Sequence, residues 1–292
     1  MRRLRTIWTS YWFTPAPLLD LGINRAILAA ILLFLTGLTR YREIALRHPD
    51  HWSPVDAIAF LGFAQPDLET MKVLGWCTAV LLVLVGVGLC TRVALLLLLP
   101  LIFVEEAMLY SFGKISHGTI PLLYALLFLL LSPCNQRFSL DGLWQRRGGD
   151  IPPPVMSSFA RWPIDLLYVV LSGFYFSAAV SKLLTSGIRW ADGNTLQYYL
   201  LYKAEPLGLA LAQYPWLCMA GSVAVLCWQL TYPLGMFRRL RPFYLLGGVF
   251  FHLSTGFLMG VWFWPVAILC VLFIPWTRVP TWWPVRKRKE FA

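Results

Sequence analysis

The sequence predicts an all-α fold, a polytopic helical membrane bundle with about eight transmembrane helices. Of its 292 residues, 58% are hydrophobic and only 13% are charged, which is too apolar for a domain whose surface faces water. Several apolar stretches are long enough to cross about 30 Å of hydrocarbon as a helix. None shows the two-residue alternation of a membrane barrel, so we expect the spans to be helical.

Hydropathy along the chain places eight spans, of which the fourth is short. Only residues 262–265 separate the last two, which therefore form either a tight hairpin or one broken helix. The spans lie near residues 23–39, 73–89, 93–110, 119–131, 164–184, 217–237, 243–261 and 264–276.

The cations predict the orientation of these spans. With the N-terminus inside, sixteen Lys and Arg residues fall in inner segments and seven in outer segments. Cytoplasmic loops carry the excess of Lys and Arg, so we expect both termini in the cytoplasm, most simply of a bacterial inner (plasma) membrane. The inner set is Arg2, Arg3, Arg5, Arg92, Arg137, Arg146, Arg147, Arg161, Arg238, Arg239, Arg241, Arg278, Arg286, Lys287, Arg288 and Lys289, and the outer set is Arg40, Arg42, Arg47, Lys72, Lys114, Arg189 and Lys203.

The net charge of +11 does not indicate a nucleic-acid partner, because the cations lie in short clusters beside apolar spans. Anionic lipid headgroups are the expected partner of these clusters. Residues 1–20 are basic and aromatic, lack a long apolar core, and predict a retained interfacial segment. The six cysteines are scattered in or beside spans without a close metal-type pair.

Ionisable residues at membrane depth are costly, so each needs a partner or a function. Four places qualify, namely the pair Glu105 and Glu106, His117, Lys182 and His252. At a helix rise of about 1.5 Å per residue, His117 and Lys182 lie near the outer ends of their spans and His252 nearer the middle. We therefore expect these groups to meet in a cavity that opens to the outer side.

Lys182 is the candidate base. Gly173, Ser177 and Ser181 form a small-residue face at four-residue spacing, which would let another helix approach closely. Lys182 lies one step off that face, so we expect its amine to point into the bundle. Loss of water would favour the neutral amine there, which can accept a proton.

Other roles for these residues are possible. A lysine near the end of a span often extends to the headgroups, and a membrane histidine often makes a structural hydrogen bond. Glu105 or Glu106 can neutralise Lys182 or Arg25. Two imidazoles and a carboxylate can hold zinc or iron, but the spacing of no known metal motif is present and we predict no metal site.

Aromatic residues are abundant, and many cluster at span ends as an interfacial belt. Five of them lie near the expected cavity and can stack on a flat ligand such as a quinone. These candidates for cofactor binding are Tyr175, Trp190, Tyr198, Tyr199 and Phe251.

Three blocks resemble the HTTM membrane domain that is shared with vitamin K-dependent gamma-carboxylase. Residues 117–144, HGTIPLLYALLFLLLSPCNQRFSLDGLW, are similar to the family's histidine, apolar helix and terminal S-x-D-G-L. Residues 176–200, FSAAVSKLLTSGIRWADGNTLQYYL, are similar to its lysine-bearing helix end and W-x-x-G. Residues 250–259, FFHLSTGFLM, are similar to its F-H helix. We expect residues 1–20 to be interfacial, 21–276 to form the HTTM-like domain and 277–292 to be a basic cytoplasmic tail.

The resemblance implies a membrane enzyme in which a lysine acts as the base on a reduced quinone, of the vitamin K or menaquinone type, that reacts with oxygen to become an epoxide. Lys182 matches that lysine, and His117 and His252 match histidines of the same site. The carboxylase also uses carbon dioxide and continues into a large luminal domain that binds its peptide substrate, whereas this sequence ends at Ala292.

We therefore expect epoxidation, or carboxylation or another modification of a small or peptide substrate. The alternatives are a non-catalytic accessory factor in peptide or toxin maturation that binds a membrane partner protein, and a lipid or small-molecule transporter that uses the same cavity.

Overall fold

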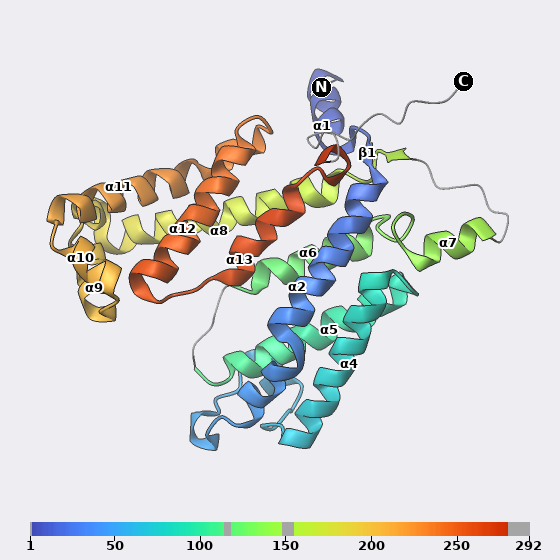
Figure 1. Cartoon of the computed structure of the whole chain (residues 1–292), viewed down its shortest axis with the longest axis horizontal. Coiled ribbons are helices and arrows are strands. Elements are labelled where there is room, and N and C mark those ends of the chain that lie inside the picture. The colour runs from blue at the N-terminus through green and yellow to red at the C-terminus, as the bar shows by residue number, and fades with distance from the viewer. Residues whose placement is uncertain (1, 114–117, 148–154, 280–292) are drawn as a thin grey trace, which may run out of the picture. The chain divides into compact units, whose positions relative to one another are not determined.

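The computed structural model describes residues 2–113, 118–147 and 155–279, which are mainly helical (Figure 1). Among these residues, six helices are long and apolar enough to cross a membrane: Leu18–Leu35, Leu68–Val87, Thr91–Tyr110, Trp162–Asp192, Pro215–Met236 and Arg241–Met259. The prediction of a helical, multi-pass membrane protein is confirmed. Two shorter apolar helices, Ile120–Leu131 and Trp264–Phe273, coincide with the predicted fourth and eighth spans.

The chain divides into two compact units. The first comprises residues 1–117, 122–163 and 271–292, and the second comprises residues 118–121 and 164–270. The first holds α1 (Arg2–Phe13), β1 (Ala16–Pro17), α2 (Leu18–Ala45), α3 (Asp56–Phe60), α4 (Leu68–Val87), α5 (Thr91–Tyr110), most of α6 (Ile120–Leu131), α7 (Leu140–Arg147) and β2 (Met156–Ser157). The second holds α8 (Trp162–Ser186) apart from its first residues, and then η2 (Gly187–Asp192), α9 (Asn194–Lys203), α10 (Pro206–Ala212), α11 (Pro215–Thr231), η3 (Tyr232–Met236), α12 (Arg241–Met259) and α13 (Trp264–Leu269).

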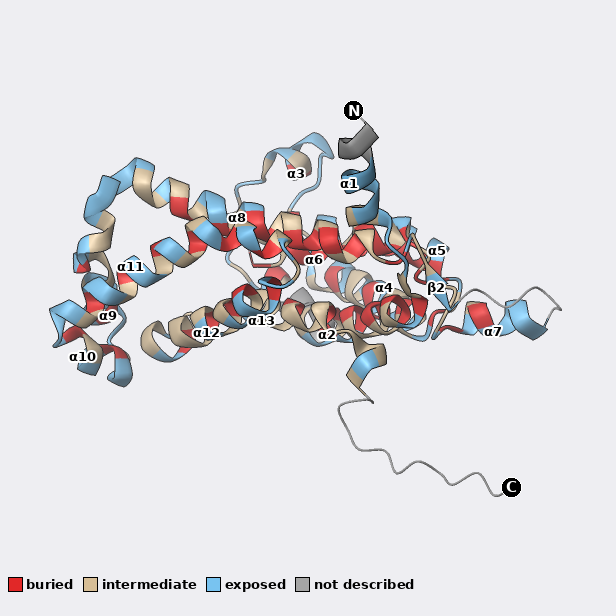
Figure 2. Cartoon of the chain, turned by 90° about the horizontal axis from the view of Figure 1, so that it is seen from above, coloured by how far each residue is buried: buried red, intermediate tan, exposed pale blue. Residues whose placement is uncertain are grey.

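In the first unit, α2 packs against α4, and α4 packs against α5. Leucines of α2 at helical spacing, including Leu21, Leu28 and Leu32, are almost fully buried (Figure 2). Asp67 caps the start of α4, because its carboxylate accepts a hydrogen bond from the backbone N–H of Thr70 at 2.7 Å. This bond satisfies one of the free N–H groups at the start of the helix, which begins at Leu68.

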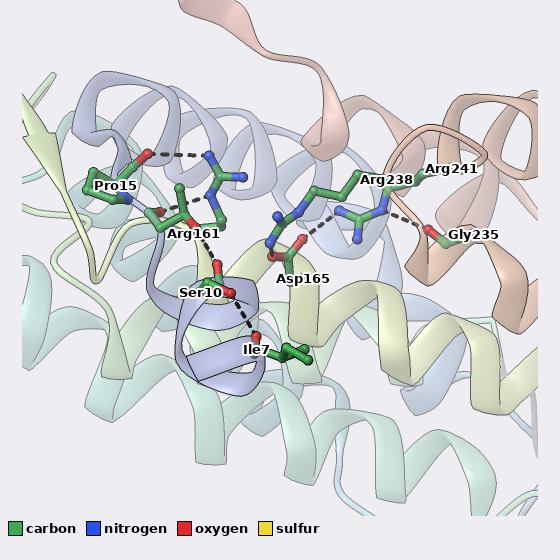
Figure 3. Close-up of polar contacts among 9 residues, drawn as sticks. Ile7, Ser10, Pro15, Arg161, Asp165, Gly235, Arg238 and Arg241 are labelled. Atoms are coloured by element: carbon green, nitrogen blue, oxygen red, sulfur yellow. Dashed lines mark hydrogen bonds and ion pairs between the residues drawn. The ribbon is translucent and has the colours of Figure 1, made fainter. Parts of the chain in front are cut away.

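A short antiparallel pair joins two distant segments of this unit. Ala16 of β1 lies opposite Ser157 of β2. Beside this pair, the Arg161 guanidinium donates to the carbonyl oxygens of Thr14 and Pro15, at 2.9 Å and 3.3 Å (Figure 3). The end of α1 is thereby held near the start of α8. Trp8 of α1 is exposed, and the interfacial position of this helix stays a prediction.

The S-x-D-G-L motif fixes the connection between α4 and α5. The Asp141 carboxylate accepts hydrogen bonds from the backbone N–H groups of Cys90 and Thr91, at 2.7 Å and 2.9 Å, and so satisfies donors at the start of α5. At Gly142 an added Cβ would lie 2.5 Å from the carbonyl oxygen of Gln136, so only glycine fits. The motif is structural in this unit.

Arg25 of α2 is a fully buried cation. Its Nη1 donates to the carbonyl oxygen of Cys134 at 3.2 Å, and its Nη2 donates to those of Gly86, at 3.3 Å, and Phe138. Gly86 lies in the last turn of α4, and Cys134 lies just after α6. The partners of this cation are therefore backbone carbonyls near two helix ends, which carry partial negative charge.

In the second unit, buried positions follow one face of α12. They recur every three or four residues, at Arg241, Tyr244, Gly248, His252 and Gly256. After Gly260, whose φ is +63°, the chain turns back, and Cys270 comes to lie beside the carbonyl oxygen of Leu245. The last two apolar segments therefore form a hairpin rather than one broken helix.

The W-x-x-G motif also has a conformational role. Gly193 has a φ of +89°, and an added Cβ would lie 2.4 Å from the backbone nitrogen of Met219 in α11. Glycine therefore lets the chain pass from η2 into α9 while it touches the backbone of another helix. This contact fixes where Trp190, three residues earlier, approaches the end of α8.

Candidate functional site

A stripe of polar and aromatic side chains on α8 faces the interior of the second unit. Tyr168, Tyr175 and Lys182 recur every seven residues, which is two helical turns. Tyr168 and Tyr175 are buried, and Lys182 is half-buried. In a membrane helix such side chains are expected to face protein rather than lipid.

The expected small-residue contact face was wrong. Gly173, Ser177 and Ser181 are exposed, and an added Cβ at Gly173 would meet no atom within 4 Å. Lys182 does turn toward the interior, but through the stripe that it shares with the tyrosines. Polar groups on large side chains cost free energy in lipid unless they are hydrogen-bonded, so they decide which face of α8 turns inward.

The Lys182 amine turns back along its own helix. Its Nζ donates to the Gln229 Oε1 atom at 2.9 Å and to the carbonyl oxygen of Ala178 at 3.2 Å. It also lies 5.3 Å from the ring centroid of Trp190. A lysine that reaches for headgroups from the end of a span would extend the other way. The amine is instead held between α8 and the buried Gln229 of α11.

His252 pairs with Tyr175 at the middle of these helices. The Tyr175 hydroxyl and the His252 Nε2 atom are 2.7 Å apart. His252 is buried, and its Nδ1 atom has no hydrogen-bond partner among the described residues. Whichever tautomer is present, Nδ1 can therefore bind a further polar group, as a donor or as an acceptor.

Trp228 and Phe251 surround this pair. The Trp228 ring lies 4.8 Å from Tyr175 and 5.6 Å from Phe251, centroid to centroid. Its Nε1 atom is buried and, within the described part of the chain, has no hydrogen-bond partner. At Gly247 an added Cβ would lie 2.5 Å from this nitrogen, so the glycine lets the indole approach α12 closely.

The two groups are linked through α11, because Trp228, which contacts Tyr175, is followed directly by Gln229, which binds Lys182. Within the described residues no hydrogen bond joins Lys182 and His252. His117 lies outside those residues, so its position relative to this site stays a prediction.

Tyr198 and Tyr199 lie apart from the Tyr175 group. Both are exposed on α9, and Tyr198 stacks on Tyr202 with a centroid distance of 6.1 Å. Exposed tyrosines between two spans are typical of the boundary between lipid and water. Of the five aromatic candidates, the structure brings Tyr175 and Phe251 to His252 and Trp190 to Lys182.

The buried acids of the first unit have partners of their own. Glu105 accepts a hydrogen bond from the Thr78 hydroxyl at 2.6 Å, and both Glu105 and Glu106 are buried. Arg25 is bound by backbone carbonyls rather than by the glutamate proposed as one alternative. Across the described residues, no group of three His, Cys, Asp or Glu side chains could hold a metal ion.

At the start of α8, Asp165 binds two arginines that follow α11. Its Oδ1 accepts from Arg241 Nη1 at 2.7 Å, and its Oδ2 accepts from Arg238 (Figure 3). The Arg241 guanidinium also lies 4.6 Å from the ring centroid of Tyr168, whose hydroxyl donates to the carbonyl oxygen of Tyr232 at 3.0 Å. These contacts join α8, η3 and α12 at one end.

The HTTM domain model matches residues 13–282. The chain belongs to the HTTM family. The match contains all three blocks on which the resemblance rests, so the family prediction is confirmed. Comparisons with curated proteins and with solved structures gave no match. The HTTM assignment therefore supports a membrane protein of this family, and the chemistry of the site must be argued from its residues.

Gln229 and Trp228 were not predicted as site residues from the sequence. An amide and an indole carry no charge, so they do not stand out among ionisable residues. Gln229 is nevertheless an amide in the largely apolar second half of α11, and burial of an amide demands a hydrogen bond. A neutral polar residue inside an apolar span is therefore a signal in the sequence that points to Gln229.

The Asp165 cluster should contribute to stability. We expect Asp165→Asn to lower the free energy of unfolding by about 2 kcal/mol, because two guanidinium groups lose a charged acceptor. Denaturant titration in detergent micelles would measure this. Glu69→Gln is the matched control: its pair with Lys72 at 2.6 Å is exposed, and we expect a change of about 0–1 kcal/mol. Equal effects of the two variants would contradict a structural role for Asp165.

Proposed function

We propose that this HTTM protein is a membrane enzyme in which Lys182 acts as the base on a reduced quinone of the vitamin K or menaquinone type. The observation that carries the proposal is the position of the Lys182 amine. Lys182 points to Gln229 between two helices instead of extending to the headgroups. An amine held away from bulk water can lose its proton more readily and then accept another.

The residues around His252 fit a flat ligand that carries oxygen atoms. His252 Nδ1 and Trp228 Nε1 are buried polar atoms without a hydrogen-bond partner among the described residues. Quinone oxygens would satisfy them, and the rings of Tyr175 and Phe251 would flank the ligand. Trp190, which lies beside the Lys182 amine, is proposed as a further contact, whereas Tyr198 and Tyr199 lie apart from this group. When bound, a reduced quinone would be oxidised by oxygen to its epoxide, with one oxygen atom entering the epoxide and the other leaving as water with the two quinol hydrogens.

Each side chain then has a defined task. Lys182 accepts a proton at Nζ, and the nearby Trp190 ring would stabilise the resulting ammonium ion. Tyr175 fixes the orientation of the His252 ring, so that Nδ1 can hold the ligand. His117 is proposed as a second orienting group, as the resemblance implies. Oxygen, and in a carboxylation also carbon dioxide, would be co-substrates, with a small or peptide acceptor.

The proposal includes the topology. Six long helices and two shorter apolar ones support eight spans. The excess of sixteen cations over seven supports cytoplasmic termini in a bacterial inner membrane. Lys182 then lies toward the outer side, where we propose that the site opens.

The test is an assay of the purified protein in lipid nanodiscs. We expect epoxide to form from chemically reduced menaquinone or a reduced vitamin K analogue in air, and not under argon. Labelled bicarbonate added with candidate peptides would reveal carboxylation. Epoxide formation no faster than in empty nanodiscs would contradict the proposal.

A second candidate is a non-catalytic accessory factor in peptide or toxin maturation. It is supported by the contacts of the Lys182 amine, since Gln229 and Ala178 satisfy it as in a structural bond between helices. This function predicts that Lys182→Met lowers stability or partner binding, while neither the variant nor the native protein forms epoxide.

A further inference from the structure

Gln229 is a buried side chain that binds the Lys182 amine. It is 2% exposed, and its Oε1 atom accepts from Lys182 Nζ at 2.9 Å. An ammonium nitrogen only donates hydrogen bonds, so the charged form of Lys182 requires the amide to present its oxygen at this contact. We infer that Gln229 is a positioning residue for Lys182, an inference that rests on the proposed role of Lys182 as the base.

The hydrogen bonds of the Lys182 amine explain how Gln229 would help it to act as a base. A neutral amine has two N–H donors and one lone pair. Gln229 Oε1 and the carbonyl oxygen of Ala178 occupy both donors. Neither oxygen can donate to the lone pair, so the lone pair points away from both and stays available to accept a proton. Without Gln229 the amine would have one protein acceptor and could turn to other directions.

The identity of the acceptor also matters. An amide oxygen is uncharged, so it binds the amine without adding a full negative charge beside it. A carboxylate at the same place would bind the ammonium form much more strongly. Gln229→Glu should therefore keep the amine in place but protonated, whereas Gln229→Leu should release it toward the headgroups.

The test reads the amine directly and does not depend on turnover. Protein in nanodiscs is treated with acetic anhydride, which acetylates neutral amines, and acetylation of Lys182 is measured by mass spectrometry relative to the exposed Lys203. At pH 8 we expect Gln229→Glu to lower this ratio at least tenfold and Gln229→Leu to raise it at least threefold. A glutamine with only a structural role would leave the ratio in folded protein unchanged, and that result would overturn the inference.

The same variants separate this inference from the proposed function. If Gln229→Leu does not fold, Gln229→Glu carries the test, because it keeps the length of the side chain and an acceptor. In the epoxidation assay we expect Gln229→Glu to lower kcat with little change in KM and to displace the pH profile. Altered acetylation without epoxide formation by the native protein would support the position of Gln229 and contradict the enzymatic proposal.

Discussion

Replacement of Lys182 by methionine is expected to lower epoxide formation by about 10²–10⁴-fold, the range found when a general base is lost. Methionine has a similar length and keeps the contacts of the side-chain stem, but it cannot accept a proton. Initial rates with reduced menaquinone, at saturating quinol and in air, would measure the effect.

Two further substitutions decide what the loss means. Lys182→Arg keeps the positive charge but cannot supply a neutral base, so we expect it to be as inactive as Lys182→Met. Lys203→Met, at an exposed position of α9, should retain native activity. If Lys182→Arg is nearly as active as the native protein, a fixed charge is sufficient and the base role is wrong. Loss of Lys182 also leaves buried Gln229 without its partner, so folding must be checked by thermal unfolding.

The sequence predicted the helical, multi-pass character well, because length and hydropathy alone decide whether a helix can cross a membrane. The helix of Lys182 and the helix of His252 both lie where the apolar stretches placed them. The Lys182 amine does point into the bundle as predicted, but the small-residue face from which this was predicted is exposed. A period of seven residues, Tyr168, Tyr175 and Lys182, marks the interior face of α8, and the four-residue period of small residues does not.

Pairing between helices could not be predicted in the same way. Gln229 lies 47 residues after Lys182, and nothing in the local pattern shows that their side chains meet. Tyr175 and His252 are 77 residues apart in the sequence, and their hydrogen bond likewise depends on how α8 and α12 pack.

Arg25 shows most clearly that the sequence does not reveal the partner of a buried charge. The cost of a buried cation predicts that Arg25 has a partner, and the sequence offers glutamates as candidates. Its hydrogen bonds go instead to backbone carbonyls, whose positions cannot be read from residue types. Gly88 adds a further constraint, because an added Cβ there would lie 2.4 Å from Arg25 Nη1.

Arg25→Met is expected to lower the free energy of unfolding by about 3 kcal/mol. The carbonyl oxygen of buried Cys134 and the half-buried ones of Gly86 and Phe138 would lose a donor. Each buried unsatisfied group costs about 1–3 kcal/mol, while removal of the buried charge offsets part of the loss. Arg25→Lys should cost less, because one ammonium can still reach some of the carbonyls. Denaturant titration in detergent micelles would measure both changes.

The control is Arg92→Met, which removes an exposed arginine near the start of α5. We expect it to change the free energy of unfolding by at most about 0.5 kcal/mol. If Arg25→Met is no more destabilising than Arg92→Met, then water or neighbouring donors satisfy the carbonyls and Arg25 does not hold these helix ends together. A large effect of Arg25→Met with native epoxidation by the remaining folded protein would also show that the stability of the first unit and the chemistry of Lys182 are separable.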